Sequence, residues 1–314
     1  MDGWVRALRG PKTPPSTRRP IQVVHEQERR LDGSVVEATT VFLAGKECPF
    51  SCVFCDLWQE TLDHPTPPGA IPHQLERALE EISHRSVIKL YNASNFFDPA
   101  AVPPGDDAAM LQLLEGFARV TVECHPHFVN GRCFAFAERL GGRLEVAMGL
   151  ETVHLDALAR LNKKMTLADF DARAAALGSC QIDLRVFVLF GCPFIAASDQ
   201  LDWTLRSVDH AVRCGAGTIS IIPVRGGNGV LESLAAEGDW SPVCLEQVEQ
   251  VFDQALGQTD AVVQLDLWDL ERLARCPRCF DARRARLHEM NRLGRQMRRI
   301  YCSHCGTVVT SGRS

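Results

Sequence analysis

The chain has 314 residues, of which 46% are hydrophobic and 23% are charged, and this balance excludes a disordered or fibrous protein. Its formal net charge is −5, so overall charge alone does not indicate a nucleic-acid partner. No apolar run approaches the roughly 18 to 20 residues that span a bilayer. The first 20 residues contain prolines and arginines where a signal peptide needs an apolar stretch, so we expect a cytoplasmic protein.

After a basic, proline-rich arm, short β-branched runs alternate with longer segments of helical periodicity. This alternation is typical of βα units on a parallel sheet. Strands are predicted at Thr39–Ala44, Val87–Tyr91, Arg119–Cys124, Leu144–Leu150, Ile182–Phe190 and Thr218–Ile222, with a last short one near Val262–Leu267. Helices are predicted near Pro72–Ile82, Asp107–Phe117, Arg132–Leu140, Leu167–Leu177, Asp199–Cys214 and Leu245–Leu256. Thr166 and Asp169 form a plausible capping pair for the fourth of these helices.

The strand around Leu144–Glu151 predicts which side chains face a barrel interior. Val146, Met148 and Leu150 share an apolar face, and Gly149 and Glu151 share the other. Glu151 then lies at the C-terminal mouth, where ligand-binding groups of parallel barrels collect. By the same count Lys89 and Arg185 point inward, either as mutually paired charges or as ligand contacts, because an unpaired buried charge is costly.

Thirteen cysteines, an odd and mostly scattered set, favour thiols or metal ligands over a closed disulfide framework. Cys48, Cys52 and Cys55 form a C-x3-C-x2-C loop directly after the first predicted strand. Three thiolates can hold three irons of a 4Fe-4S cluster and leave the fourth iron open, whereas a ferredoxin-type carrier needs a fourth cysteine. A zinc knuckle or three thiols without a role are the alternatives.

At these residues the sequence resembles the radical SAM superfamily, in its elongator-like and MiaB-like branch, whose signature has an aromatic residue, here Phe54, before the third cysteine. The resemblance implies an α/β fold with a partial (βα)6 TIM-like barrel. It also implies that S-adenosylmethionine (SAM) chelates the open iron, and that an electron from a low-potential donor yields a 5′-deoxyadenosyl radical. Such a radical abstracts hydrogen from a substrate in a dry, closed site.

The resemblance also carries roles to residues of this chain. Cys48, Cys52 and Cys55 look like cluster ligands, and Phe54 looks like a neighbour of the adenine. The turn after the second strand usually contains glycines that meet the SAM amino group, and this chain has no glycine there. The candidate cofactor-binding residues are Phe54, Asn92, Ala93, Ser94, Glu151 in Gly-Leu-Glu-Thr, and the inward-facing Arg185.

Cys192, in Phe-Gly-Cys-Pro-Phe after the fifth strand, is predicted at the barrel mouth. A thiol there could donate a hydrogen atom to a substrate radical, or serve only as a small apolar side chain. Cys124 has the same two interpretations. No role is assigned to Cys133, Cys180, Cys214 or Cys244.

The C-terminal tail carries two further C-x2-C pairs, Cys276 with Cys279 and Cys302 with Cys305. Four thiolates at such spacing suit tetrahedral zinc, and a second iron-sulfur cluster is the alternative.

Arg272 to Arg299 contains ten arginines against Asp281 and Glu289, a local charge of +8 that leaves −13 for the remainder. Because two acidic residues cannot balance ten arginines, these arginines favour phosphate binding, and a solvated helix face is the alternative. The candidate RNA-binding residues are Arg283, Arg284, Arg286, Arg295, Arg298 and Arg299.

Taken together, the cysteine loop, Lys-Leu-Tyr-Asn, Gly-Leu-Glu-Thr, Pro-Val-Arg-Gly-Gly-Asn-Gly and the tail resemble archaeosine-synthase radical SAM subunits. That resemblance implies modification of a tRNA nucleoside by C–N bond cleavage, with a partner enzyme in the same modification. A small-molecule or peptide substrate, or a non-enzymatic iron-sulfur or zinc RNA-binding protein, are the alternatives. The expected domains are an arm (1–37), the barrel (38–270) and an arginine-rich zinc-binding tail (271–314).

Overall fold

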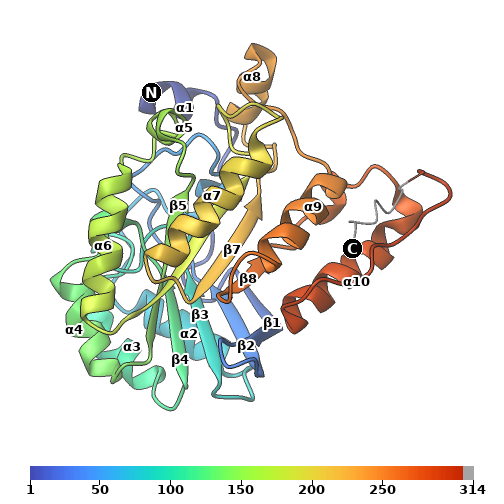
Figure 1. Ribbon diagram of the computed structural model, residues 1–314. Helices are drawn as coiled ribbons and strands as arrows, with labels where there is room; N and C mark the ends of the chain where they lie inside the picture. Colours follow the sequence, from blue (N-terminus) through green and yellow to red (C-terminus); the bar gives the residue numbers. More distant parts are fainter. Residues whose placement is uncertain (307–314) are drawn as a thin grey trace.

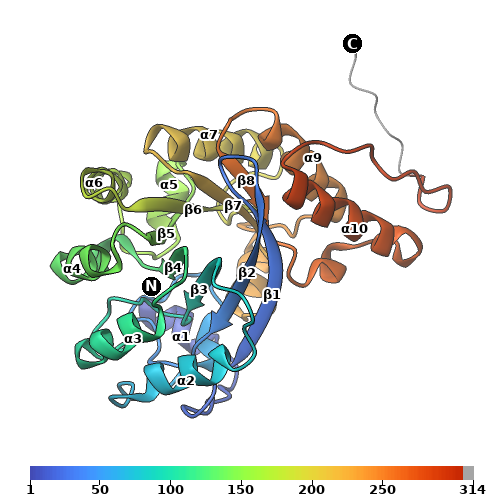
Figure 2. The ribbon, with the colours of Figure 1, turned by 90° about the horizontal axis from the view of Figure 1, so that it is seen from below.

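The computed structural model describes residues 1–306, and its centre is one curved sheet of eight strands that nearly closes into a barrel (Figures 1 and 2). The strands lie in the sheet in the order of the sequence; β1 and β2 are antiparallel, and every later pair is parallel. The α/β barrel expected from the sequence is therefore confirmed. The strands are β1 Gln22–Arg29, β2 Val35–Phe42, β3 Val87–Tyr91, β4 Arg119–Glu123, β5 Leu144–Glu151, β6 Asp183–Phe190, β7 Thr218–Pro223 and β8 Val262–Leu265.

Helices in the βα connections cover the outer face of the sheet, as crossover connections between parallel strands require (Figure 2). The helices are α1 Asp2–Ala7, α2 Ala70–Leu79, α3 Asp107–Leu113, α4 Gly131–Leu140, α5 Leu155–Arg160, α6 Leu167–Ser179, α7 Gln200–Arg213, α8 Val230–Glu237, α9 Leu245–Leu256 and α10 Pro277–Leu293. α6 begins with the predicted capping box, in which the Thr166 hydroxyl accepts from the Asp169 amide at 3.1 Å. Within residues 1–306, no helix combines the length and the apolar composition that a membrane span needs.

The first strand, β1, lies inside the segment for which the sequence predicts only a basic arm. Its residues pair with β2 in one hairpin, from Gln22 opposite Phe42 to Arg29 opposite Val35. The strand pattern is hidden because His25 to Arg29 are five consecutive polar residues, which show no apolar alternation. The polar residues are accommodated because part of β1 faces charged groups inside the barrel.

Those interior charges pair with one another. Arg185 donates to Glu28 at 2.7 Å and to Glu145 at 3.0 Å, and Lys89 donates to Glu28 at 3.0 Å. Burial acts to raise the pKa of Glu28, but the two cations outweigh it and lower the pKa to about 2. Of the two interpretations that the sequence allows for Lys89 and Arg185, the structure thus shows the paired-charge one.

Candidate functional site

The cysteine loop follows β2 at the end of the barrel where the parallel strands finish, and two segments hold its backbone, one at residues 161–162 and one at Asn228. The Val53 amide donates to the Leu161 carbonyl at 3.1 Å. The Asn162 side chain donates to the Ser51 carbonyl at 2.7 Å, and the Asn228 side chain donates to the Val53 carbonyl at 2.9 Å. Asn228 belongs to the Pro-Val-Arg-Gly-Gly-Asn-Gly motif, so this motif fixes the loop from the far side of the barrel.

The N-terminal residues lie against the same loop, and Figure 1 shows α1 beside α5 at this end of the molecule. Asp2 accepts from the Asn162 amide at 2.6 Å, and Arg6 donates to the Ser51 hydroxyl at 3.3 Å. A side chain on Gly229 would meet the Leu8 carbonyl oxygen at 2.1 Å, so the arm packs tightly where α8 begins. The expected arm is therefore part of the site's cover.

The three thiols of the loop stand in a desolvated environment. Burial raises the pKa of Cys48, raises the pKa of Cys52 to about 12, and raises the pKa of Cys55 well above its usual range. The Lys163 ammonium opposes this rise at Cys48 and Cys52, and the Asn95 amide donates to the Cys48 sulfur at 3.4 Å. Thiolates here need a cation, and three of them fit an iron-sulfur cluster that keeps one iron open.

Glu151 lies at the end of β5, as predicted, and forms an ion pair with Lys163 at 2.7 Å. The sheet register shifts between Gly149 and Glu151, and Glu151 has a φ of +68°, so the bulge re-aims its side chain into the mouth. A Cβ on Gly149 would lie 2.2 Å from the Glu151 carboxylate and 2.6 Å from the Lys163 nitrogen. The absent side chain therefore provides the space that the ion pair occupies.

The turn after β3, where the resemblance places a contact to the SAM amino group, surrounds a carboxylate. The Asn92 amide donates to Glu123 at 2.6 Å, and the amides of Ala93 and Ser94 also donate to this carboxylate. Burial nevertheless raises the pKa of Glu123 to about 7. Within the described residues, the Asn92 side-chain nitrogen and the Ser94 hydroxyl are buried without a hydrogen-bond partner. Unpartnered polar atoms at this position fit a polar ligand such as SAM.

Four residues of the site are missed by the sequence reasoning: Asn95, Glu123, His125 and Lys163. His125 stacks on Phe50 at a centroid distance of 4.1 Å, and its Nε2 lies 2.9 Å from the Lys163 carbonyl. Burial lowers the pKa of His125 to about 3, which keeps the ring neutral. The sequence signal for Asn95, Glu123 and His125 is their place at or just after the ends of β3 and β4, where site residues of a parallel barrel collect. Lys163 lies in the loop before α6 and has no such signal.

Cys192 is 1% exposed and lies in the same neighbourhood as Glu151, whose charge adds to the burial that raises the pKa of this thiol. Phe54 is half-buried and packs on the barrel core. Arg185 lies elsewhere: it is the third residue of β6, deep in the barrel, and Glu28, Glu145 and Gln264 occupy its guanidinium. The prediction that Arg185 binds the cofactor is therefore not supported by its position.

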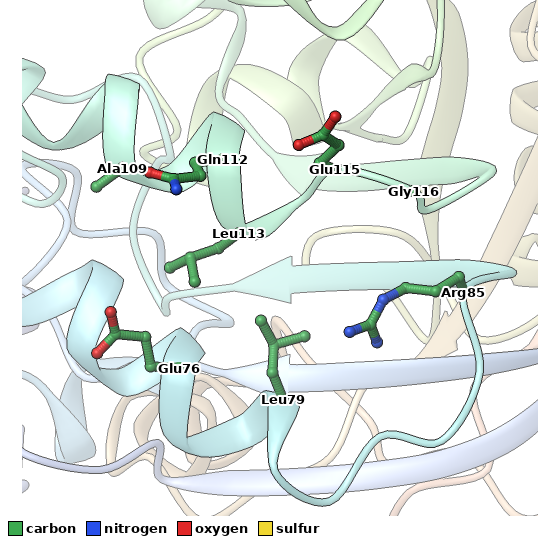
Figure 3. A pocket seen from close by; sticks show the side chains of 8 residues that line it. All are labelled: Glu76, Leu79, Arg85, Ala109, Gln112, Leu113, Glu115 and Gly116. Carbon is green, nitrogen blue, oxygen red and sulfur yellow. The ribbon is translucent and has the colours of Figure 1, made fainter.

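A pocket of about 650 Å³ opens beside the cysteine loop. Cys48, Phe50 and Trp58 line it together with cations of the N-terminal arm, among them Arg6 and Lys12. A second pocket, of about 520 Å³, lies between α2 and α3 on the outer face of the barrel and contains no thiol (Figure 3). Of these two pockets, the first is thus the one that borders the cysteine loop.

The tail arginines are not the unbalanced set that the sequence indicates. Arg283 is 1% exposed and donates to Glu249 at 2.9 Å, and Arg286 donates to Asp253 at 2.6 Å. Their partners are presented by α9, some 35 residues away along the sequence, so a local charge count cannot find them. The prediction that Arg283 and Arg286 contact RNA is corrected accordingly.

The other predicted RNA contacts remain at or near the surface. Arg299 is half-buried and pairs with Asp253 at 2.8 Å, and Arg284 is exposed and pairs with Asp281 at 3.3 Å. The exposed arginines of the described tail are Arg272, Arg275, Arg278, Arg284, Arg295 and Arg298.

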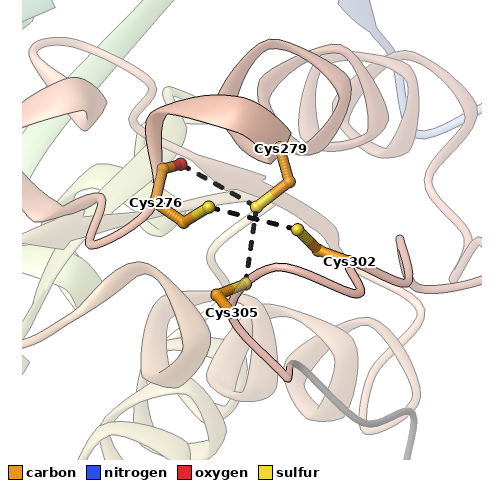
Figure 4. Close-up of side chains that lie close together, drawn as sticks. All are labelled: Cys276, Cys279, Cys302 and Cys305. Carbon is orange, nitrogen blue, oxygen red and sulfur yellow. Dashed lines mark hydrogen bonds between the residues drawn. The ribbon is translucent and has the colours of Figure 1, made fainter.

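The sulfurs of Cys276, Cys279, Cys302 and Cys305 all lie within 4.8 Å of one another at the start of α10 (Figure 4). The structure thus brings together the two cysteine pairs that 22 intervening residues separate in the sequence.

No family model and no curated protein matches the chain. Solved structures do: archaeal Elp3 of Methanocaldococcus infernus has a TM-score of 0.52 and 13% identity, over 72% of this chain and 58% of that one. Streptococcus suis SuiB bound to S-adenosylmethionine has a TM-score of 0.49 and 11% identity, over 71% of this chain and 45% of that one. Coproporphyrinogen III oxidase HemN of Escherichia coli, a radical SAM enzyme, has a TM-score of 0.47 and 12% identity, over 82% of this chain and 55% of that one.

The chain spans less than two thirds of the length of each of these proteins. The likeness to Elp3 concerns the fold, and it agrees with the α/β barrel described above.

Proposed function

We propose that this protein is a radical SAM enzyme whose Cys48, Cys52 and Cys55 hold a 4Fe-4S cluster. The observation that carries the proposal is the position of three half-buried cysteines on one fixed loop at the mouth of the barrel, where burial raises the pKa of each thiol. When bound, the cluster supplies an electron for reductive cleavage of SAM to methionine and a 5′-deoxyadenosyl radical.

The chain's own residues orient and shield the reacting groups. Glu123 and Glu151 present carboxylates toward the mouth, where they suit the amino group and hydroxyl groups of SAM, and Lys163 holds Glu151 in place. The Asn95 amide directed at the Cys48 sulfur stabilises it as a ligand. His125 stacks on Phe50 of the loop, and Arg6 of α1 bonds to Ser51, so both limit the access of water to the loop.

Anaerobic reconstitution and assay for 5′-deoxyadenosine test this proposal. Wild-type protein and Cys180→Ala, which alters an exposed thiol, should both contain the cluster and release 5′-deoxyadenosine with dithionite and SAM. Cys52→Ala should lower the yield at least a hundredfold. Equal yields from Cys52→Ala and Cys180→Ala would exclude the cluster assignment.

For the substrate, we propose a tRNA nucleoside, modified by chemistry like that of archaeosine synthase, with a low-potential electron donor and a partner enzyme in the same modification. The resemblance of the motifs supports this proposal, and so do the exposed arginines of the tail: Arg275 and Arg278 near the first cysteine pair, and Arg295 and Arg298 in the segment after α10. Arginine binds phosphate through paired N–H donors, so these side chains suit a polyanion.

The RNA proposal is tested by the salt dependence of tRNA binding. Affinity should fall with salt at a slope of about 0.7 to 0.9 per phosphate contacted. Combined Arg278, Arg295 and Arg298→Ala should flatten this slope, whereas combined Arg139, Arg173 and Arg213→Ala, which removes the same charge from the exposed outer helices, should not. If both triple variants bind alike while 5′-deoxyadenosine release persists, a small-molecule or peptide substrate takes the place of tRNA.

A further inference from the structure

The four tail cysteines form a compact group that the radical SAM chemistry does not use. Cys276 precedes the first residue of α10, Cys279 lies in its first turn, and Cys302 and Cys305 lie in the segment that returns past it (Figure 4). Cys276, Cys279 and Cys302 are buried and form an apolar cluster of their own, separate from the barrel core. Three cysteines alone bury too little apolar surface to hold the returning segment in place.

The distances between the sulfurs fit a single ion. The Cys276 and Cys302 sulfurs lie 4.0 Å apart, and the Cys279 and Cys305 sulfurs lie 3.9 Å apart. Four thiolates around a tetrahedral zinc ion, with Zn–S bonds of about 2.3 Å, have sulfurs about 3.8 Å apart. In a 4Fe-4S cluster each cysteine binds a different iron at an outer corner, so the four sulfurs lie farther apart than the ligands of one ion.

The helix that carries this group covers the open seam of the barrel. Figure 2 shows α10 beside β1 and β8, the two edge strands that are not paired with each other. The Asn291 side chain donates to the Leu265 carbonyl and accepts from the Leu265 amide, both at 2.8 Å. A Cβ on Gly294, which ends α10, would lie 2.4 Å from Nε of Arg29 in β1. α10 is thus seated on both edges.

The segment that returns toward the cysteines is also anchored to α10 and α9. Arg286 donates to the carbonyls of Met297 and Arg298, each at 3.1 Å from its Nε, and Arg299 donates to Asp253 at 2.8 Å. These bonds fix residues 297–299, which directly precede the part of the segment that contains Cys302 and Cys305. The buried arginines of the tail therefore have a structural role in this arrangement.

We propose that Cys276, Cys279, Cys302 and Cys305 bind one tetrahedral zinc ion, which ties the returning segment to the first turn of α10 and so keeps this helix closed over the β1–β8 seam. Such a site is structural, because all four ligands come from the protein and no position stays open for a substrate. Binding of the ion is coupled to the folding of the tail.

Metal analysis of the full chain, purified and kept anaerobic, tests the zinc. We expect one zinc per chain in wild type and in Cys180→Ser, and at least a fivefold loss in Cys302→Ser. Replacement of the zinc by Co²⁺ in wild-type protein should give the visible absorption bands of tetrahedral sulfur coordination, a readout that does not depend on the folding of a variant. Iron in place of zinc at these thiols, or full zinc in Cys302→Ser, would overturn the proposal.

Hydrogen exchange tests the consequence for the seam. In Cys302→Ser the amides of α10 and of β8 should exchange at least tenfold faster, and those of β4 at the wild-type rate. Unchanged exchange in α10 and β8 after loss of zinc would refute the closing role. Because the cluster loop is separate from the tail, Cys302→Ser should still form 5′-deoxyadenosine, whereas Cys52→Ala should not. The assay therefore tests the cluster proposal independently of the zinc proposal.

Discussion

The Lys163 ammonium lies 2.7 Å from the Glu151 carboxylate, and both groups are buried at the mouth of the barrel, where they also face the cysteine loop. A buried ion pair of this kind is stable only where the protein holds both groups in good geometry, because each charge has lost its hydration. Here the bulge of β5 and the missing side chain of Gly149 supply the position and the space. The pair therefore links the fold of one strand to the electrostatics of the cluster site.

Gly149→Ala should disturb the site more than the fold. The added methyl group cannot share space with the Glu151 and Lys163 side chains, so the ion pair must shift, at a cost of about 1 to 3 kcal/mol in unfolding free energy. We expect SAM binding, measured by equilibrium dialysis on reconstituted protein, to weaken at least tenfold. Gly105→Ala is the control, since nothing lies near its Cβ position. SAM affinity that is the same in both variants would contradict the role of the pair.

Asn228→Ala should loosen the cysteine loop. Asn228 is 2% exposed, and its side chain donates to the Val53 carbonyl and accepts from the amides of Val230 and Leu231. Loss of these bonds should lower the unfolding free energy by about 1 to 3 kcal/mol and shorten the lifetime of the cluster in the presence of an iron chelator. Asn228→Asp retains the acceptor for α8 but not the donor to the loop. It should therefore lose its cluster as fast as the alanine variant while remaining more stable.

Glu123 should make the stability of the protein depend on pH. Burial raises its pKa from the usual 4.5 to about 7, so the folded state binds a proton that the unfolded state releases. The stability associated with this proton is present below pH 4.5 and is lost as the pH rises through 7. Relative to Glu123→Gln, the wild type should therefore lose about 2 kcal/mol between pH 5.5 and pH 8. Urea unfolding at the two pH values measures this difference, and exposed Glu138→Gln should show no such trend.

Arg283→Ala should destabilise the tail rather than report on RNA. Removal of this guanidinium leaves Glu249 buried without one of its cationic partners, a change that costs about 3 to 5 kcal/mol for a buried pair. Arg284→Ala removes an exposed arginine from the next position and should cost less than about 1 kcal/mol. Thermal unfolding of both variants gives the comparison. Equal melting temperatures would show that Arg283 is not part of a buried ion pair.

Features that depend on neighbouring residues can be predicted from the sequence alone. The cysteine triplet, the two tail pairs, the alternation in β5 and the capping box of α6 are all local patterns, because ligand spacing, strand parity and helix caps involve residues a few positions apart. Glu151 at the barrel mouth followed from the same count.

Ion pairs between residues that are far apart in the sequence become visible only in the folded chain. Residues of α9 neutralise Arg283 and Arg286, β1 supplies Glu28 to Arg185, and the loop before α6 supplies Lys163 to Glu151. Each of these charges looks the same in the sequence whether it is paired or free. Only the folded chain settles which it is, because a buried charge is stable only where the fold brings its counter-charge within bonding distance.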